Sequence, residues 1–234
     1  MKNISIVIPI YNETRRLNKL FKNILLLNTK FKIEFIFVDD GSNDNTVYKI
    51  KNFIKKFKKK KYRFKLIKSM KNLGKGGALR LGVLYSHNNW IFTMDADMSV
   101  NFNQIKQWRK KYLFNKKYAY FGSRNHKNSN VTKKVHRRLM GIVFQFLVFI
   151  FFDRNISDSQ CGFKLYNKIY AKKIFSKMQT FGFAHDLELI KLLKNNDIKI
   201  KELPVTWRHE NNGKLNVLTD PFKMLFDIIL IKLR

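Results

Sequence analysis

Short apolar runs alternate with amphipathic stretches through the first 100 residues of the chain. Continuous apolar runs predict strands at 4–10, 33–40, 64–69 and 90–94, and helical spacing of apolar residues predicts helices at 15–27, 45–58 and 76–85. Strands that are apolar on both faces and joined by helices are typical of a parallel sheet covered by helices on both sides. We therefore expect a mostly parallel α/β fold of the Rossmann type, with ligands bound at the carboxyl ends of its strands.

The second half of the chain is less regular and contains two strongly apolar segments. A loop and an αβ stretch reach to about residue 205. The run at 139–152 predicts an apolar helix near 137–152, which is shorter than the roughly 20 residues that span a membrane. The tail predicts an amphipathic helix at 221–233, because apolar residues recur there at helical spacing, namely Phe222, Leu225, Phe226, Ile229, Leu230 and Leu233. Both helices are candidates for packing on the core or on a membrane surface.

Composition excludes a disordered chain and points to an anionic partner. Hydrophobic residues make up 45% and aromatic residues 15% of the 234 residues, which is enough to build a sizeable core. The single Cys161 cannot form an intrachain disulfide, so we expect a reducing, cytoplasmic location. With 48 Lys and Arg against 16 Asp and Glu, the net charge is +32. Nucleic acid, an anionic membrane surface or a phosphorylated substrate would each suit that charge, and A/T-rich codon usage is an alternative source of the lysines.

Acidic and polar residues follow three of the expected strands, at the point where each strand ends. They are Pro9, Tyr11, Asn12 and Glu13 after the first, Asp39, Asp40, Gly41 and Ser42 after the second, and Asp95 and Asp97 after the strand at 90–94. Carboxylates gathered at one sheet edge repel one another unless a cation or hydrogen-bond donors compensate. Hard oxygen ligands of this kind suit Mg²⁺ or Mn²⁺ together with substrate phosphates, which implies a nucleoside diphosphate substrate.

These motifs resemble those of family-two glycosyltransferases with the GT-A fold. Within that family, the likeness is greatest to the polyprenyl-phosphate sugar transferases, which include the dolichyl-phosphate glucosyl- and mannosyltransferases. The donor-side motifs are VIPIYNE (7–13), VDDGS (38–42), NLGKGGALRLG (72–82) and MDADMS (94–99). The likeness continues through GSR (122–124), DSQCGFKLY (158–166), AHDLELI (184–190) and VTWRHENNGKL (205–215). It therefore covers nearly the whole chain.

The resemblance implies a role for each set of residues. Pro9, Tyr11, Glu13 and Asp39 would hold the base and ribose of a nucleotide sugar, with Asp40 in support and Lys75 beside the diphosphate. Asp95 and Asp97 would hold the metal and the diphosphate. Residues 1–100 would form the nucleotide-sugar half of one domain, residues 101–215 the acceptor half, and residues 216–234 a tail that contacts membrane. The glycine-rich segment 72–77 is either an anion-binding turn, with its N–H groups free for a ligand, or a tight packing loop.

Basic residues in the second half match the acceptor side of this family. Arg124, Arg138, Lys164, Arg208 and Lys214 are the candidates for holding the phosphate of a polyprenyl phosphate lipid, because a phosphate needs cations and N–H donors around it. Solvated surface charge is the alternative for each of them. No spacing typical of a zinc site is present, and Cys161 is expected to be a packed thiol.

His185-Asp186-Leu187-Glu188 occupies the place where inverting members of this family carry an acidic pair that supplies a general base. A sugar hydroxyl needs such a base, because its proton leaves as the oxygen attacks. A phosphate acceptor is already ionised and depends more on positioning and on stabilisation of the leaving group. Asp186 is therefore a candidate either for the base or for orienting Arg124 or Lys164.

Taken together, these observations predict an inverting hexosyltransferase that is peripheral to the cytoplasmic face of a membrane. Its donor would be UDP-glucose or GDP-mannose, its acceptor dolichyl or undecaprenyl phosphate, and its cofactor Mg²⁺ or Mn²⁺. Two alternatives remain open: a related transferase with a saccharide hydroxyl as acceptor, and a basic nucleic-acid-binding protein. The absence of a recognisable nucleic-acid-binding motif makes the second less favoured.

Overall fold

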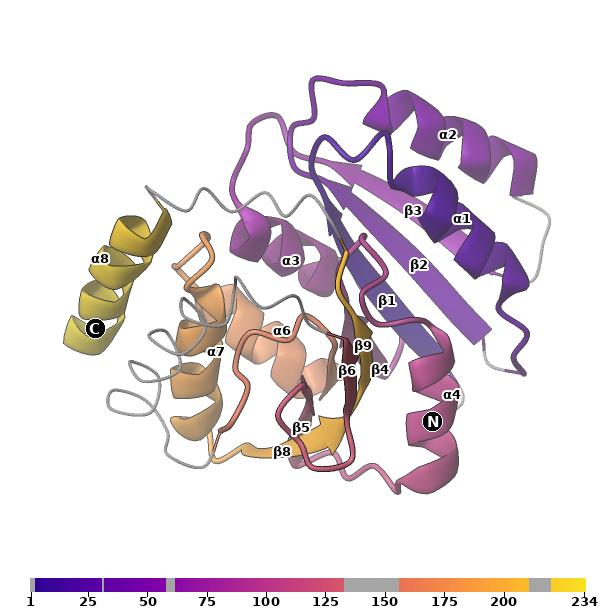
Figure 1. The fold of residues 1–234 in the computed structure, drawn as a ribbon. Coiled ribbons are helices and arrows are strands. Elements are labelled where there is room, and N and C mark those ends of the chain that lie inside the picture. The colour runs from indigo at the N-terminus through magenta and orange to yellow at the C-terminus, as the bar shows by residue number, and fades with distance from the viewer. Residues whose placement is uncertain (1–2, 31, 58–61, 133–155, 211–219) are drawn as a thin grey trace.

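A seven-stranded sheet forms the centre of the molecule, with the strand order β3-β2-β1-β4-β7-β5-β8 (Figure 1). The computed structural model describes residues 3–30, 32–57, 62–132, 156–210 and 220–234. The sheet strands are β1 (Asn3–Ile10), β2 (Lys32–Asp39), β3 (Arg63–Lys68), β4 (Trp90–Thr93), β5 (Tyr118–Ser123), β7 (Lys164–Asn167) and β8 (Lys199–Pro204), and β6 (Asn130–Thr132) pairs with β9 (Thr206–Arg208) in a small second sheet.

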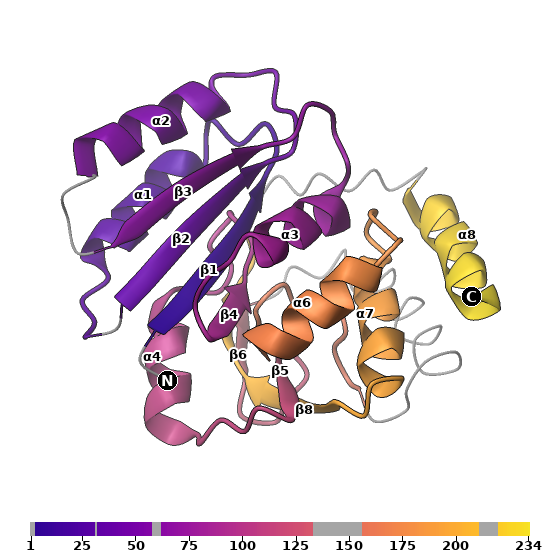
Figure 2. The same cartoon turned by 180° about the vertical axis from the view of Figure 1, so that it is seen from behind.

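Helices cover both faces of the large sheet, as the sequence predicts. They are α1 (Leu17–Leu26), α2 (Thr46–Phe57), α3 (Lys75–Leu84), α4 (Asn103–Lys111), α6 (Lys168–Lys177), α7 (His185–Lys194) and α8 (Asp220–Leu233). In Figure 2, α3 and α6 lie in front of the sheet, whereas α1 lies behind it. Alternate residues of a strand point to opposite faces, so β2 gives Phe35 and Phe37 to one apolar cluster and Ile36 and Val38 to the other. The expected fold class is confirmed, and the expected helix near 137–152 lies outside the described residues.

The direction of β7 distinguishes the second half of the sheet from the first. Strands β3, β2, β1 and β4 are parallel, but β7 is antiparallel to both β4 and β5. Its first residue, Lys164, pairs with Thr93, the last residue of β4. The Thr93 hydroxyl donates to the carbonyl of Gly162 at 3.1 Å. The reversal therefore brings the turn before β7 to the edge where the parallel strands end.

The tail helix α8 packs through one face and leaves another exposed. Met224, Ile228 and Ile231 are buried, and the Lys191 ammonium of α7 donates to the Ile231 carbonyl at 2.7 Å. The exposed apolar side chains are Leu225, Phe226, Ile229 and Leu233. Within the described part of the chain, every helix falls short of the length and apolar character required for a membrane span.

Candidate active site

The loops after β1 and β2 are joined at the carboxyl edge of the sheet. Asn12 has a left-handed backbone, with φ at 47°, and its N–H donates to the Ser42 hydroxyl at 2.8 Å. The Asn43 N–H donates back to the Asn12 side chain at 3.0 Å, and the Glu13 N–H donates to the Thr46 hydroxyl at 2.8 Å. These bonds hold the chain at Tyr11 and Glu13 beside Asp39, and the nucleotide-binding roles of these residues stay predictions.

Asp39 and Asp40 are adjacent but have different surroundings. Asp39 is almost completely buried; its Oδ2 accepts from the Ser42 N–H at 3.3 Å, and its Oδ1 has no hydrogen-bond partner among the described residues. Asp40 instead accepts from the N–H groups of Leu73 and Gly74 at 2.8 and 2.9 Å. Burial raises the pKa of Asp40, although those two hydrogen bonds oppose the shift. Asp39 therefore retains an unused acceptor for a ligand, whereas Asp40 supports the glycine segment.

The glycine-rich segment 72–77 is a packing loop rather than an anion-binding turn. Its N–H groups at Gly76 and Gly77 donate to the carbonyl of Phe181 at 2.7 and 3.4 Å, and those at Leu73 and Gly74 are taken by Asp40. Gly74 has φ at 87°, a conformation that favours glycine. Of the two interpretations that the sequence allows for this segment, the structure favours the close-packing one, because four of its N–H groups already have acceptors within the protein.

Lys75, Asp95 and Asp97 form the most strongly charged part of this edge. The Lys75 ammonium lies 2.7 Å from Asp95 Oδ1. Burial alone would lower the pKa of Lys75, but the carboxylates of Asp95 and Asp186 outweigh it and raise the pKa, so the ammonium stays charged. Burial raises the pKa of Asp97, and the neighbouring Asp95 raises it further. The two carboxylates thus carry a repulsion that a divalent cation would relieve.

The turn before β7 lies directly against Asp95. A Cβ atom added to Gly162 would lie 2.7 Å from the carboxylate carbon of Asp95, which is far too close. Glycine at this position therefore lets Asp95 occupy its observed place. The preceding Cys161 is buried, and burial raises the pKa of its thiol to about 12, so it is a packed thiol, as the sequence predicts.

Arg124 of the acceptor half is engaged by a carboxylate that the sequence analysis did not single out. Its Nε and Nη2 each lie 2.7 Å from an oxygen of Asp158, and its backbone N–H donates to the same carboxylate at 2.8 Å. Asp158 is held in turn, since its N–H donates to Glu202 at 2.8 Å. The guanidinium also lies 5.7 Å from the centre of the Trp207 ring. Arg124 therefore pairs with Asp158 and not with Asp186.

Lys164 and Asp186 form a buried ion pair. The Lys164 ammonium donates to Asp186 Oδ1 at 2.5 Å, and the two side chains are 2% and 6% exposed. Of Arg124 and Lys164, the two partners that the sequence allows for Asp186, the structure shows Lys164. Lys164 is also one of the residues expected to hold the acceptor phosphate, and its burial and its bond to Asp186 disfavour direct contact with a lipid headgroup.

Arg208 is exposed and lies beside the turn that carries Asp97. Its N–H donates to the Ser99 carbonyl at 2.9 Å, and Ser99 in turn donates its N–H to Asp97 at 2.8 Å. The backbone of Arg208 is therefore bonded directly to the turn that carries Asp97. Arg138 and Lys214 lie outside the described residues, so their expected roles stay predictions.

The comparisons with known proteins agree with this arrangement. The model of glycosyl transferase family 2 matches residues 5–175, which include both Asp95 and Asp97 and the turn at Gly162. This chain is a member of glycosyl transferase family 2. It is consequently a glycosyltransferase, and the alternative of a nucleic-acid-binding protein is set aside.

Similar proteins match this family-2 glycosyltransferase over nearly its whole length. The dolichyl-phosphate beta-glucosyltransferase of Saccharomyces cerevisiae is 33% identical and covers 98% of this chain and 74% of its own. The human protein of the same name is also 33% identical and covers 100% and 76%. Among solved structures, glucosyl-3-phosphoglycerate synthase from Mycobacterium tuberculosis in complex with Mn²⁺ and UDP-glucose has a TM-score of 0.72 at 14% identity, over 99% of this chain and 79% of its own. That likeness confirms the GT-A fold.

The carboxylates of this glycosyltransferase suit a divalent metal that is also coordinated by a bound ligand. Within the described ranges no group of three or more His, Cys, Asp or Glu side chains could enclose a metal ion. Asp95 and Asp97 are hard oxygen donors on one short turn, and Mg²⁺ is commonly held by one or two carboxylates together with substrate phosphates. The two carboxylates therefore suit a metal whose remaining ligands come from the donor diphosphate.

Sequence reasoning missed three residues that shape the site of the glycosyltransferase. These are Asp158, which holds Arg124, Glu202, which holds Asp158, and Gly162, which lies against Asp95. One signal was available: acidic residues are scarce in this chain, 16 of 234, and an acid in an apolar setting is a candidate partner for a buried base or N–H group. Gly162 had no comparable signal.

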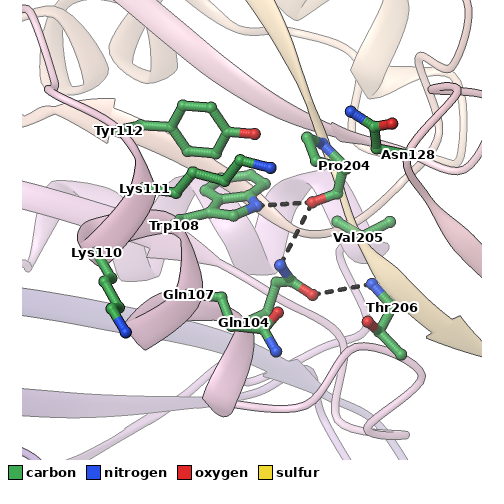
Figure 3. Close-up of a pocket in the computed structure, with 10 residues that line it drawn as sticks. All are labelled: Gln104, Gln107, Trp108, Lys110, Lys111, Tyr112, Asn128, Pro204, Val205 and Thr206. Atoms are coloured by element: carbon green, nitrogen blue, oxygen red, sulfur yellow. Dashed lines mark hydrogen bonds between the residues drawn. The ribbon is translucent and has the colours of Figure 1, made fainter.

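A separate pocket of about 530 Å³ lies between α4 and the chain from β8 to β9 (Figure 3). The Trp108 indole N–H donates to the Pro204 carbonyl at 2.8 Å, and the Gln104 side chain accepts from the Thr206 N–H at 2.9 Å. None of the ten residues drawn in Figure 3 carries a carboxylate or belongs to the predicted site. The predicted site residues at the carboxyl edge of the sheet therefore lie outside this pocket.

Proposed function

We propose that this glycosyltransferase transfers glucose from UDP-glucose to a polyprenyl phosphate such as dolichyl phosphate, with inversion at the anomeric carbon. The observation that carries the proposal is its likeness, over both the donor and acceptor halves, to proteins named dolichyl-phosphate beta-glucosyltransferase. The resemblance to a solved structure that holds UDP-glucose adds support for the donor but shares only the fold. Glucose is favoured over mannose on this basis.

The carboxyl edge of the sheet offers a place for each part of the donor. Asp39, with its unpartnered Oδ1, would accept a hydrogen bond from the base or ribose. Asp95 and Asp97 would hold Mg²⁺ or Mn²⁺, which when bound stabilises the negative charge of a departing diphosphate. Lys75 would contribute a further positive charge at the same place, since its ammonium already lies beside Asp95. Tyr11 and Glu13 lie on the loop that is bonded to the β2 loop.

The reaction would be a single displacement at the sugar. An oxygen of the acceptor phosphate attacks the anomeric carbon from the face opposite UDP, the new C–O bond forms, and the bond to the β-phosphate oxygen of UDP breaks with its electron pair. No proton has to be removed, because the acceptor phosphate is already ionised. Arg208 would orient that phosphate by charge, with Arg138 and Lys214 as further candidates. Arg124 is held by Asp158 and would shape this side of the site.

We also propose that transfer occurs at the cytoplasmic face of a membrane, to which the protein binds peripherally. The exposed side chains of Leu225, Phe226, Ile229 and Leu233 give α8 an apolar surface, and the chain ends in Arg234. Apolar residues that insert at the lipid interface, together with a net charge of +32, suit binding to an anionic membrane. A lipid acceptor would then be presented in the same plane as the enzyme.

The decisive experiment is a transfer assay with a panel of donors and acceptors. Radiolabelled UDP-glucose and GDP-mannose would each be incubated with dolichyl phosphate, undecaprenyl phosphate and a saccharide acceptor, with Mn²⁺, Mg²⁺ or EDTA. We expect label from UDP-glucose in a charged lipid product that has a β linkage, and none with EDTA. Label in the saccharide but not in the lipid would overturn the proposal in favour of a hydroxyl acceptor.

A further inference from the structure

The segment His185-Asp186-Leu187-Glu188 begins helix α7 and is buried in full. The exposed fractions of His185, Asp186 and Glu188 are 1%, 4% and 6%. A general base must reach the proton that it removes, within hydrogen-bond distance of a plausible acceptor. Because these side chains point into the protein and not into solvent, their role has to be inferred from their contacts with other residues.

Asp186 is committed to positive charges inside the protein. Its Oδ1 accepts from the Lys164 ammonium at 2.5 Å, and that ammonium also lies 4.9 Å from the centre of the Phe121 ring. Burial alone would raise the pKa of Asp186, but its interactions with His185 and with the Lys164 ammonium outweigh burial and the pKa is lowered. A carboxylate that is held ionised in this way is a weak base and a strong counter-ion.

The same carboxylate also contacts His185, the first residue of α7. The Nε2 atom of His185 lies 3.3 Å from Asp186 Oδ1. The Cβ of His185 lies against Gly76, which follows Lys75 at the start of α3. Loss of the Asp186 charge would therefore disturb the side chain that packs on this end of α3.

Glu188 supports the start of α3 through the backbone. Its carboxylate accepts from the N–H of Gln179 at 3.0 Å and from that of Thr180 at 2.5 Å. The next residue, Phe181, uses its carbonyl to accept from the N–H of Gly76 at 2.7 Å. Glu188 thus fixes the loop to which the first turn of α3 is bonded.

His185 completes the contact by packing. Its Nδ1 carries the hydrogen, because it lies 2.8 Å from the Gly182 carbonyl oxygen, which can only accept. Its Cβ lies so near Gly76 that a Cβ added to Gly76 would be 2.6 Å away. All three polar residues of the segment therefore support the first turn of α3, which begins with Lys75 and Gly76.

We propose that His185, Asp186 and Glu188 are positioning residues that hold Lys75 in place for the donor diphosphate, and that this segment supplies no general base. The inference rests on the proposed function, in which the acceptor is a phosphate and needs no base. The proposal gives the segment a role in donor binding, whereas its position in the sequence would predict a general base that activates the acceptor.

The test separates donor affinity from turnover. The variants are Glu188→Ala, Glu188→Gln and Asp186→Asn, with Asp197→Asn as a matched control, because Asp197 is exposed and follows the other end of α7. Calorimetry measures the Kd for UDP with Mn²⁺, and steady-state assays measure kcat and KM for UDP-glucose. We expect Glu188→Ala and Asp186→Asn to raise Kd and KM about tenfold, the value of a lost charge-assisted hydrogen bond, with kcat within about threefold of wild type.

Glu188→Gln keeps an oxygen that can accept from the loop, so it should restore most of the affinity that Glu188→Ala loses. A role as general base predicts the opposite pattern, with UDP affinity unchanged and kcat lower by about 10²–10⁴. A role in stability alone predicts a lower melting temperature with unchanged Kd at temperatures where the variants are folded. Either of these two patterns would overturn the proposal.

The test remains decisive if one variant does not fold or if the proposed acceptor is wrong. If Asp186→Asn does not fold, because Lys164 is left buried without its carboxylate, the Glu188→Ala and Glu188→Gln pair decides alone, since Glu188 bonds only to backbone N–H groups in the contacts described above. The measurement of UDP binding needs no acceptor. If wild type makes no glucosylated lipid but the variants still lose UDP affinity, the proposed acceptor is wrong and the positioning role stands.

Discussion

Acidic residues in the two halves of the sheet edge have opposite surroundings. In the acceptor half, Asp158 and Asp186 are each bonded to a basic side chain, Arg124 and Lys164, at 2.5 to 2.7 Å. In the donor half, Asp39 has an unpartnered oxygen among the described residues. Asp97, in the same half, has a raised pKa because burial and Asp95 both disfavour its charge. We infer from this contrast that a ligand binds in the donor half, as the proposed function requires of the metal and the nucleotide.

This comparison also explains how a chain with a large excess of base uses its few acids. Buried basic groups need counter-ions, and those in the acceptor half are bonded so closely that both partners stay in fixed positions. The carboxylates of the donor half are held by backbone N–H groups and by Lys75 instead, which leaves oxygen lone pairs for a cation.

The largest effect is expected on stability, from Lys164→Met in the acceptor half. This change leaves Asp186 buried without its closest cation, and breaking such a pair costs about 3–5 kcal/mol in the free energy of unfolding. Urea denaturation followed by circular dichroism measures the loss. The double variant Lys164→Met/Asp186→Leu removes both charges and should recover most of it. If the double variant were less stable than the single one, the ion pair would not be the cause.

The next effect is expected on catalysis, from Asp97→Asn in the donor half. Loss of one metal-binding carboxylate should lower the transfer rate by about 10²–10³, in the range seen when one electrostatic contact of the transition state is removed. Stability should not fall, because burial and Asp95 both raise the pKa of Asp97 and so disfavour its charged form in the folded protein. Calorimetry of UDP with and without Mn²⁺ tests the cause. Equal, metal-independent affinity in wild type and variant would contradict the metal assignment.

A smaller effect is expected from Gly162→Ala, which joins the two halves. The added methyl group would displace the Asp95 carboxylate, and we expect UDP affinity in the presence of Mn²⁺ to fall about tenfold, as for an overpacked site. The metal-free affinity for UDP is the control and should be unchanged. An alanine variant with wild-type metal dependence would show that Asp95 can move without consequence.

The smallest effect on the enzyme itself is expected from the exposed face of α8. Phe226→Ser/Ile229→Ser should change the free energy of unfolding by less than about 0.5 kcal/mol per site while lowering binding to anionic vesicles about tenfold or more. The matched variant Met224→Ser/Ile228→Ser alters the buried face of the same helix, so it should destabilise the fold instead. Flotation of both variants with vesicles at low salt distinguishes the faces. Unchanged flotation of the first variant would remove α8 from membrane binding.

Much of the fold could be predicted because its signals are local. The strands expected at 4–10 and 33–40 are observed as Asn3–Ile10 and Lys32–Asp39, and the tail helix expected at 221–233 as Asp220–Leu233. Each has a continuous or periodic apolar pattern that ends at turn residues. The reversed direction of β7 could not be predicted, because four residues carry no signal of direction and their partners lie far away in the chain.

The positions of the candidate site residues could be predicted where they depend on strand ends. They could not be predicted where they depend on burial of a side chain. Asp39, Asp95 and Asp97 follow strands, so their common edge follows from the topology. The burial of Lys164 depends on Asp186, twenty-two residues away and on another element, and no sequence pattern records that contact. Glycine-rich segments are similarly ambiguous, because only the structure shows that Asp40 accepts from the N–H groups of Leu73 and Gly74 and that Phe181 accepts from those of Gly76 and Gly77.

The insertion of β7 between β4 and β5 has a consequence for synthesis of the chain on the ribosome. The bond from Thr93 to Gly162 joins residues 69 positions apart, and β4 has an unpaired edge until that later segment emerges. At about 5–20 residues per second, this interval lasts roughly 3–14 s. During those seconds the nascent chain contains β1, β2 and β4, and the unpaired edge of β4 lies beside the predicted metal ligands. We therefore expect this edge to be a preferred contact for chaperones, and a pause in translation between residues 94 and 164 to increase aggregation.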